Sequence, residues 1–251
     1  MPFSTVLLAA GRPSYLVTIS ANRGAWKKSV DGSSIPSTVK LNLLFVIEAG
    51  VDIQSITNVD TLTFDSLADG SRVTVQNLGH ILGEGGNASG GNGTHAIRAN
   101  FTGELRLDNG SGTIKGGGGA GGNGGQGAVY IPGDGTYDSS PPGAGSPGGG
   151  GGGAGGGNGS GSGTNGTVGN AGVAGNGAAG SGSSGNGGNG GAYGVVGSAG
   201  NNGLRSGGPL NGTVFAAGLA AGQPGNAIKH NAGTTITWIS GAGNIAGAVG
   251  T

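Results

Sequence analysis

Short runs of apolar and β-branched residues, separated by Asp, Asn and Gly, fill the first part of the chain. Three of these runs are Val39–Ile53, Thr61–Phe64 and Arg72–Leu82. The pattern returns at His95–Leu107 and at Thr113–Lys115, which leads straight into glycine. Such runs, bounded by turn-forming residues, are typical of β-strands. The sequence therefore predicts a β-containing domain over residues 1–115.

Beyond residue 82 this pattern gives way to glycine. Only six of the 67 glycines precede Gly83, so 61 lie in the remaining 169 residues, whereas glycine makes up about 7% of ordinary proteins. Too few large apolar side chains remain in this part to build a conventional core. We predict a second, glycine-rich domain over residues 116–251, ordered by something other than side-chain burial.

Glycine recurs at every third position in two stretches, from Gly116 to Gly125 and from Gly182 to Gly203. A period of three matches the polyproline II geometry, so these glycines form one bare stripe along a helix. Such a helix makes no internal hydrogen bonds, and its buried amides must bond to neighbouring helices. We therefore predict a sandwich of packed polyglycine II helices with loop insertions.

Two other structures use glycine as heavily. Collagen needs proline-rich triplets, and no proline lies between Pro147 and Pro209. A flexible glycine-serine linker remains open on composition alone. The three-residue period and the non-glycine insertions that interrupt the runs favour the packed helices.

Those insertions are the candidate functional regions. They cover residues 128–147, 164–173, 192–196 and 204–215. Tyrosine on short polar loops held by a rigid frame is typical of binding surfaces. The candidate binding residues are Tyr130, Ile131, Tyr137, Tyr193, Val195, Val196, Leu204, Arg205 and Phe215. The alternative is that each aromatic plugs an end of the bundle. If the helices run alternately up and down, consecutive insertions emerge at opposite ends, so the candidates cannot all act together.

Charge and motif content exclude several function classes. Eleven basic and eleven acidic residues give a net charge of zero, so no electrostatic footprint predicts nucleic acid or an anionic membrane as a partner. Cysteine is absent, and the three histidines lack metal-ligand spacing. Matches to the dinucleotide fingerprint are expected by chance at this glycine content, and Asp134 and Asp138 lie in a turn-rich loop. We predict no enzyme, no catalytic or metal-binding residue and no cofactor.

With no stretch long enough to span a bilayer and no signal sequence, we expect a soluble chain made in a cytoplasm.

The glycine runs at residues 116–127 (GGGGAGGNGGQG) and 148–159 (GGGGGGAGGGNG) follow an ordinary β-containing part and alternate with insertions. Over nearly the whole chain this arrangement resembles the tail-fibre tip adhesins of T-even-like phages. The resemblance implies that residues 1–115 dock on the distal end of the trimeric long-tail-fibre shaft and that residues 116–251 form a polyglycine II sandwich. It also implies that loops between the glycine motifs bind a host outer-membrane protein such as a porin, and that the chain, assembled in the host cytoplasm, lies at the fibre tip of the virion. Trp26 and Phe45 are among the apolar side chains expected to supply the fibre interface.

Two further functions stay open. A tail-fibre assembly chaperone would share the contact with the fibre but would be absent from finished virions. An ice-binding protein built on polyglycine helices would need a flat and regular face, whereas insertions with tyrosine and proline indicate irregular loops.

Overall fold

The computed structural model describes residues 5–9, 11–87, 90–122, 124, 127–131, 136–140, 187–206 and 209–251. The regular secondary structure among these residues is all β-strand, with no helix. The predicted insertion 164–173, the glycine run 148–159 and the start of the second periodic stretch lie outside the described residues. No helix in the described part of the chain could span a membrane. The chain divides into two compact units. Unit 1 contains residues 1–83, 95–116 and 226–251, and unit 2 contains residues 84–94 and 117–225.

Unit 1 consists of three sheets, here called A, B and C. Sheet A contains, in spatial order, β1 (Thr5–Ala9), β2 (Arg12–Ile19), β4 (Asn42–Ile47), β7 (Ser71–Asn77), β10 (Gly103–Asp108) and β17 (Thr234–Ser240). Sheet B contains β5 (Asp52–Gln54), β8 (His80–Leu82), β11 (Thr113–Lys115) and β18 (Ile245–Ala246). Sheet C contains β3 (Trp26–Lys27), β6 (Leu62–Asp65), β9 (Ile97–Asn100), β16 (Ile228–His230) and β19 (Val249–Gly250). The expected strands of the first part are therefore present.

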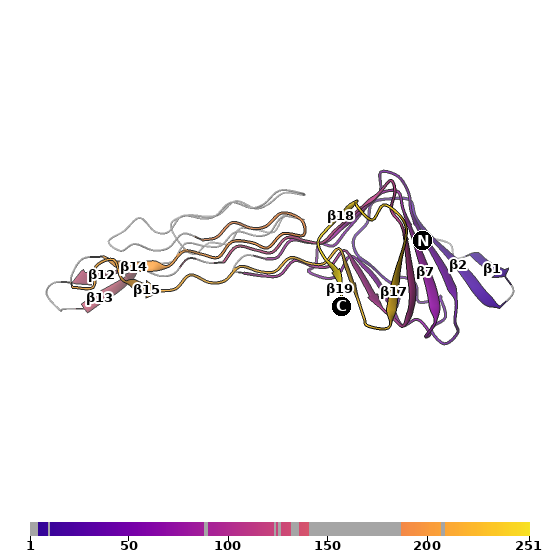
Figure 1. Ribbon diagram of the computed structural model, residues 1–251, viewed down its shortest axis with the longest axis horizontal. Helices are drawn as coiled ribbons and strands as arrows, with labels where there is room; N and C mark the ends of the chain where they lie inside the picture. Colours follow the sequence, from indigo (N-terminus) through magenta and orange to yellow (C-terminus); the bar gives the residue numbers. More distant parts are fainter. Residues whose placement is uncertain are drawn as a thin grey trace. The chain divides into compact units, whose positions relative to one another are not determined.

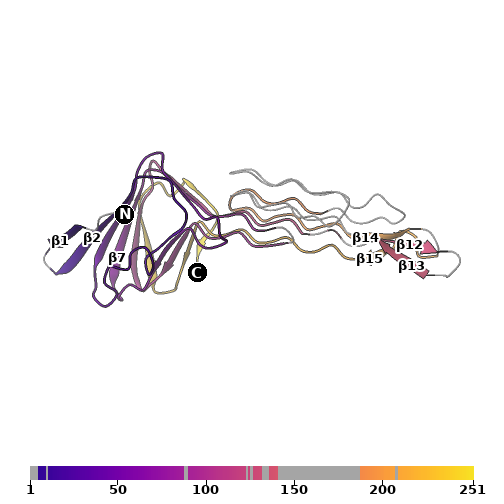
Figure 2. The same cartoon turned by 180° about the vertical axis from the view of Figure 1, so that it is seen from behind.

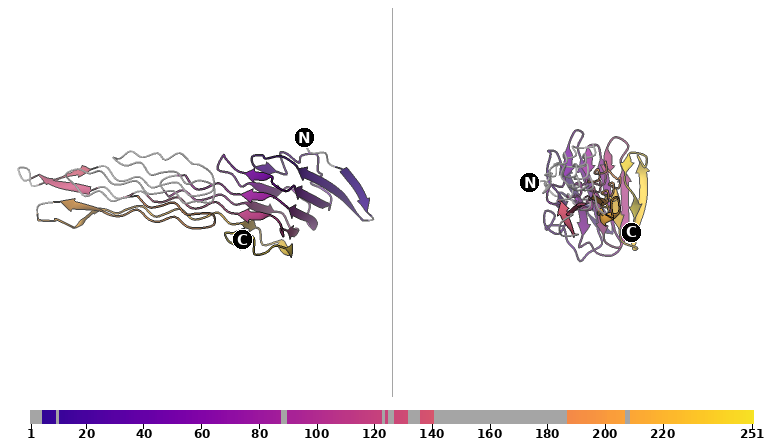
Figure 3. Two further views of the ribbon diagram at one scale, coloured as in Figure 1. Left: turned by 90° about the horizontal axis from the view of Figure 1, so that it is seen from above. Right: turned by 90° about the vertical axis from the view of Figure 1, so that its left-hand side faces the viewer.

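The chain visits the three sheets in turn. One circuit is β4, β5 and β6, the next is β7, β8 and β9, and the last is β17, β18 and β19. Each strand pairs in parallel with its counterpart one circuit earlier, and β1 pairs antiparallel with β2 at the edge of sheet A. Unit 1 is thus a three-sided parallel β-helix, and each circuit is one rung. Its sheet A strands follow one another in chain order in Figures 1 and 3.

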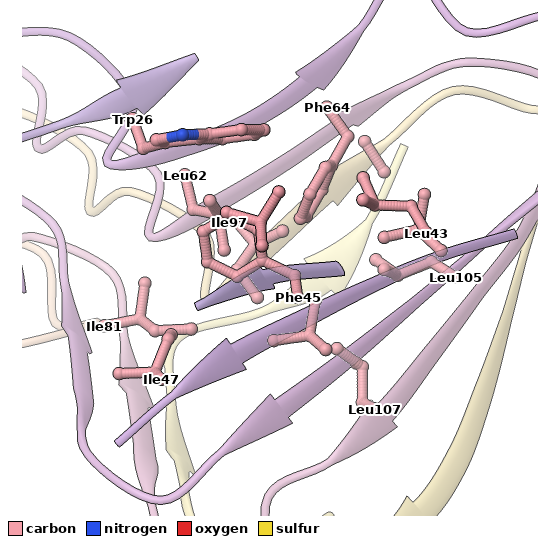
Figure 4. Packing of buried hydrophobic residues seen from close by; sticks show 14 of the residues in the cluster. Trp26, Leu43, Phe45, Ile47, Leu62, Phe64, Ile81, Ile97, Leu105 and Leu107 are labelled. Atoms are coloured by element: carbon pink, nitrogen blue, oxygen red, sulfur yellow. The ribbon is translucent and has the colours of Figure 1, made fainter. Parts of the chain in front are cut away.

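The core of unit 1 is built from columns of side chains stacked from rung to rung. Sheet B contributes Ile53, Ile81 and Ile114, which are paired in register and fully buried. Sheet A contributes a column through Phe45, whose ring lies 4.7 Å from that of Trp26 (Figure 4). A side chain of this size stabilises the fold by about 1.5–3 kcal/mol when it is fully buried. Trp26 and Phe45 are 1% and 0% exposed, so the expectation that they supply a partner interface is wrong.

Two buried asparagines satisfy the backbone where the chain turns from sheet A to sheet B. The amide of Asn77 donates to the Oδ1 of Asn109 over 2.7 Å and to the carbonyl of Thr113 over 3.1 Å. The amide of Asn109 in turn donates to the carbonyl of Asn244 over 3.2 Å. Both asparagines are fully buried. A buried backbone carbonyl without a donor is costly, so this corner depends on side-chain amides at matching positions of adjacent rungs.

Unit 2 is built mainly from extended segments that are neither helix nor strand and that run side by side (Figures 1 and 2). The segment 117–122 hydrogen-bonds to four neighbouring segments, and its partners repeat every three residues. The amides at 117 and 120 donate to Thr94 and Gly91, and those at 119 and 122 donate to Val195 and Ser198. The carbonyls at 118 and 121 accept hydrogen bonds from the amides of Gly86 and Gly90. The carbonyls at 119 and 122 accept from the amides of Gly191 and Gly188. The carbonyls at 117 and 120 accept from the amides of Gly225 and Gly222. These bonds satisfy the backbone without a conventional sheet.

The glycines of unit 2 are required by the close approach of these backbones. A Cβ on Gly188 or Gly191 would overlap the carbonyl oxygen of Ser198 or Val195. In segment 117–122, however, a Cβ at every glycine position would overlap backbone, whichever direction it pointed. The prediction of a single bare stripe is therefore wrong for this segment, because neighbours enclose it on all sides.

The observed units differ from the single boundary predicted at residue 115. Residues 226–251, assigned by sequence to the glycine-rich domain, supply β16 to β19 to the three sheets of unit 1. Residues 84–94 belong to unit 2 although they precede residue 115. The reason is that the sequence of unit 2 interrupts two rungs of the β-helix, each time between a strand of sheet B and a strand of sheet C. The chain leaves after β8 and after β11, and it returns each time into sheet C, at β9 and β16.

Candidate functional site

Most of the predicted binding residues lie in sheet D, a four-stranded sheet at one end of the extended segments of unit 2 (Figures 1 and 2). Its strands, in spatial order, are β13 (Thr136–Ser140), β12 (Gly127–Ile131), β14 (Gly203–Ser206) and β15 (Val214–Ala216). They form two antiparallel hairpins, which are joined by parallel pairing of β12 with β14.

The first hairpin brings two predicted residues together. Tyr130 pairs directly with Tyr137, and Ile131 pairs with Thr136. The Cα atoms of directly opposed residues in an antiparallel pair lie about 5 Å apart. The sequence had placed both tyrosines in one insertion, and the hairpin register now makes them neighbours.

The second hairpin is organised by Arg205. Its Nη1 donates to the carbonyl of Val214 over 2.7 Å and to the Oγ1 of Thr213 over 3.1 Å. The guanidinium lies 5.3 Å from the centre of the Phe215 ring, a cation–π arrangement. Arg205 therefore fixes the geometry of the hairpin, in addition to carrying a charge. No other Lys or Arg occurs in the sequence of unit 2.

Two exposed apolar side chains of this hairpin were missed by the sequence analysis. Leu210 is 45% exposed and Val214 is 47% exposed, although both lie inside the predicted insertion 204–215. The turn before β15 requires Gly212, which has a φ of 79°. The Asn211-Gly212 pair is a turn signal, and it could have identified Leu210 as a residue at the tip of a hairpin.

Three predicted residues lie at a different turn. The carbonyl of Ala192 accepts from the amide of Val195 over 3.0 Å, which closes a turn beside Gly119. Val195 and Val196 are about half exposed, whereas Tyr193 is only 6% exposed. β14 starts eight residue positions after Val195, which corresponds to roughly 25 Å of extended chain at about 3.1 Å per residue. The candidates therefore fall into two groups at different ends of unit 2, and the burial of Tyr193 matches the packing role that the sequence left open.

Titratable groups are concentrated in unit 1. A depression of about 510 Å³ beside sheet C is lined by Lys27, Asp60, Asp65 and Arg98. These groups pair with one another: Lys27 with Asp65 over 3.4 Å, and Arg98 with Asp60 over 2.8 Å. Among the described residues, no three His, Asp or Glu side chains are grouped as metal ligands.

His95 lies where the chain re-enters unit 1 before β9. Its Nδ1 accepts a hydrogen bond from the backbone amide of Asn226 over 2.8 Å. Burial lowers the pKa of His95, and the nearby Arg98 and Lys229 lower it further, while Asp60 opposes the change. The neutral ring is therefore the form that the fold holds.

Comparison with known proteins identifies the family. The family model of the phage tail fibre adhesin Gp38 matches residues 16–250. The chain belongs to this family. The predicted resemblance to tail-fibre adhesins is thus confirmed.

A solved structure supports the fold of this adhesin. The chain is similar to one in the crystal structure of the gp37-gp38 adhesin tip complex of the bacteriophage S16 long tail fiber, with 22% sequence identity and a TM-score of 0.51. The similarity covers 93% of this adhesin and 81% of that chain. A comparison with curated proteins found no match.

Proposed function

We propose that this adhesin lies at the tip of a long tail fibre in the virion and binds a host outer-membrane protein, such as a porin, through sheet D. The observation that carries the proposal is the pair of hairpins at one end of unit 2, with Leu210 and Val214 exposed. Binding surfaces of this kind combine apolar anchors with a rigid frame. The adhesin acts by binding, without catalysis or a cofactor.

The frame in this proposal is a polyglycine II sandwich formed by the extended segments of unit 2. The three-residue repeat of hydrogen-bond partners along segment 117–122 supports it, because three residues per turn is the geometry of this helix. Ordering so much glycine costs more backbone entropy than ordering other residues. The bonds to four neighbours offset that cost and hold the hairpins in place.

Attachment to the fibre belongs to unit 1 in this proposal. The S16 relative was solved in complex with gp37, which supports a shaft protein as the partner of this adhesin. Unit 1 has a conventional core and most of the charged side chains, so it offers a stable surface of the kind that protein partners use.

The predicted binding residues divide into a primary group and a separate one. We assign Tyr130, Ile131, Tyr137, Leu204 and Phe215 to the receptor surface, with Arg205 as its organiser. Tyr193, Val195 and Val196 lie roughly 25 Å away along the chain and cannot share a small epitope with sheet D. A few aromatic or arginine anchors usually dominate an interface, each worth about 2 kcal/mol or more on truncation.

Adsorption of phage to host cells tests this assignment. Tyr130→Ala, Tyr137→Ala and Phe215→Ala should each slow adsorption, whereas Val196→Ser, a matched change of an exposed residue at the other turn, should not. Arg205→Lys keeps the charge but not the planar fork, so it should resemble Arg205→Ala if Arg205 acts mainly by holding the hairpin.

The same phages distinguish the alternatives. If all sheet D variants assemble and adsorb like the parent phage while Val196→Ser does not, the binding surface lies at the other turn. Absence of the adhesin from purified virions would indicate a chaperone, and thermal hysteresis of the isolated protein would indicate ice binding.

A further inference from the structure

The two ends of the β-helix in unit 1 differ in how well its core columns are covered. At the N-terminal end the columns finish in Val17, Trp26 and Ile53, which are at most 4% exposed. At the C-terminal end they finish in the last rung, β17 to β19. There Ile236, Trp238 and Ile245 are only partly buried, and Val249 is 39% exposed.

Each of these side chains sits on a fully buried column. Trp238 is in register with Leu107 of the preceding rung, and Val249 is in register with Ile228. Both of those residues are 0% exposed because another rung lies beyond them. The last rung therefore presents core-type side chains that lack the next layer.

The backbone at this end also forms the edges of the three sheets. β17 ends sheet A, β18 ends sheet B and β19 ends sheet C. Among the strands that the structure describes, three parallel ones, one on each side of the β-helix, thus have a free edge on the same rung. An exposed edge beside apolar side chains is a template for further strands, and repeat folds usually cover their terminal repeat with a polar cap. The last rung carries apolar side chains in this position instead.

We propose that the last rung of the β-helix is the surface on which the tail-fibre shaft docks, with β-structure of the shaft continuing the three sheets. The inference rests on the proposed function, which makes the shaft the partner of unit 1. The partner it describes offers strand edges to β17, β18 and β19, and apolar side chains to Trp238 and its neighbours.

At the N-terminal end sheet A finishes at β1, which fits this role less well. The Gp38 family model begins at residue 16, after β1, and extends to residue 250, through the whole last rung. A shaft-binding surface shared by the family falls within the matched residues. A second copy of this adhesin is the competing occupant of the last rung, because two such ends could stack on each other.

The test measures binding of the full-length adhesin to the recombinant distal fragment of the shaft protein from the same phage. Val249→Arg and Ile239→Arg place a charge on exposed residues of the last rung, which are 39% and 48% exposed. Each should weaken binding at least about tenfold, because docking would bury an unpaired charge. Ile56→Arg, at a site that is 75% exposed in unit 1, is the matched control and should bind like the parent.

Tryptophan fluorescence gives a second readout that needs no substitution. Of the two tryptophans, Trp26 is already buried and Trp238 is partly exposed. Docking should therefore shift the emission to the blue and protect it from acrylamide, and Trp238→Phe should abolish the shift.

The outcomes separate this inference from the proposed function. If the parent adhesin does not bind the shaft fragment, the proposed attachment itself fails. If the parent binds and both last-rung variants bind equally well with no fluorescence shift, the shaft docks elsewhere and the inference is wrong. If the adhesin alone forms a dimer that Val249→Arg dissociates, the last rung serves self-association instead.

Discussion

Because segment 117–122 is enclosed by neighbouring backbones, we expect a single added methyl group to destabilise unit 2. A Cβ at Gly119 would overlap the carbonyl oxygen of Gly222, and neither backbone can move without breaking hydrogen bonds. Overpacking costs about 1–3 kcal/mol. Displacing the segment would also weaken the bonds of Gly119 to Val195 and Gly191, at about 0.5–1.5 kcal/mol each. Gly119→Ala should therefore destabilise unit 2 by about 2–6 kcal/mol.

Hydrogen exchange of the native adhesin measures this change locally. Backbone amides of segment 117–122 and its neighbours should exchange at least about 25-fold faster in Gly119→Ala, since each factor of ten corresponds to about 1.4 kcal/mol. Amides of unit 1 should keep their protection. Ala199→Val is the control, because Ala199 is exposed and lies on the surface of the same bundle.

The segment itself contains a second control. Ala120 is fully buried yet carries a methyl group, so the lattice accommodates a Cβ at this one position. Ala120→Gly should cost no more than about 1 kcal/mol, mainly through the extra freedom of the unfolded chain. Equal exchange rates in Gly119→Ala and Ala199→Val would refute close packing of backbones as the source of order in unit 2.

Two further predictions concern unit 1. Asn109→Ala removes the buried amide at the corner between sheets A and B, so it should lower the free energy of unfolding by about 2–4 kcal/mol. Denaturant titration measures this change, and Asn100→Ala, at an exposed asparagine, should have little effect. His95 has a lowered pKa, so its unfolded form binds more protons and stability should fall as the pH drops below about 6.5. His95→Gln should flatten the dependence of unfolding on pH between about 6.5 and the folded-state pKa, and an unchanged slope would exclude this histidine as its source.

The strands of unit 1 could be predicted because their alternation of buried and exposed residues is local. Val73 and Val75, for example, point into the core while Arg72 and Thr74 point away, and this alternation is legible in the sequence. The closure of the β-helix by residues 226–251 was not predictable in this way. The partners of β16, β17 and β18 lie more than a hundred residues earlier in the sequence, so only tertiary pairing identifies them.

The candidate site was predicted in part for a similar reason. Insertions in glycine runs indicated where loops occur, and both hairpins of sheet D lie in them. The direction of each segment was not encoded locally, so the sequence could not separate Tyr130 from Val196. The sequence also did not reveal that the guanidinium of Arg205 donates hydrogen bonds to Thr213 and Val214. Those contacts depend on the register of β14 with β15.

The insertion of unit 2 into the β-helix determines how the adhesin carries a mechanical load. The chain crosses between the units four times, after residues 83, 94, 116 and 225, so a force applied to unit 2 pulls on four covalent connections at once. These connections lead into β8, β9, β11 and β16, which belong to two adjacent rungs. Tension is thus divided among parallel strands held by neighbours on both sides, and no terminal strand can be peeled away first.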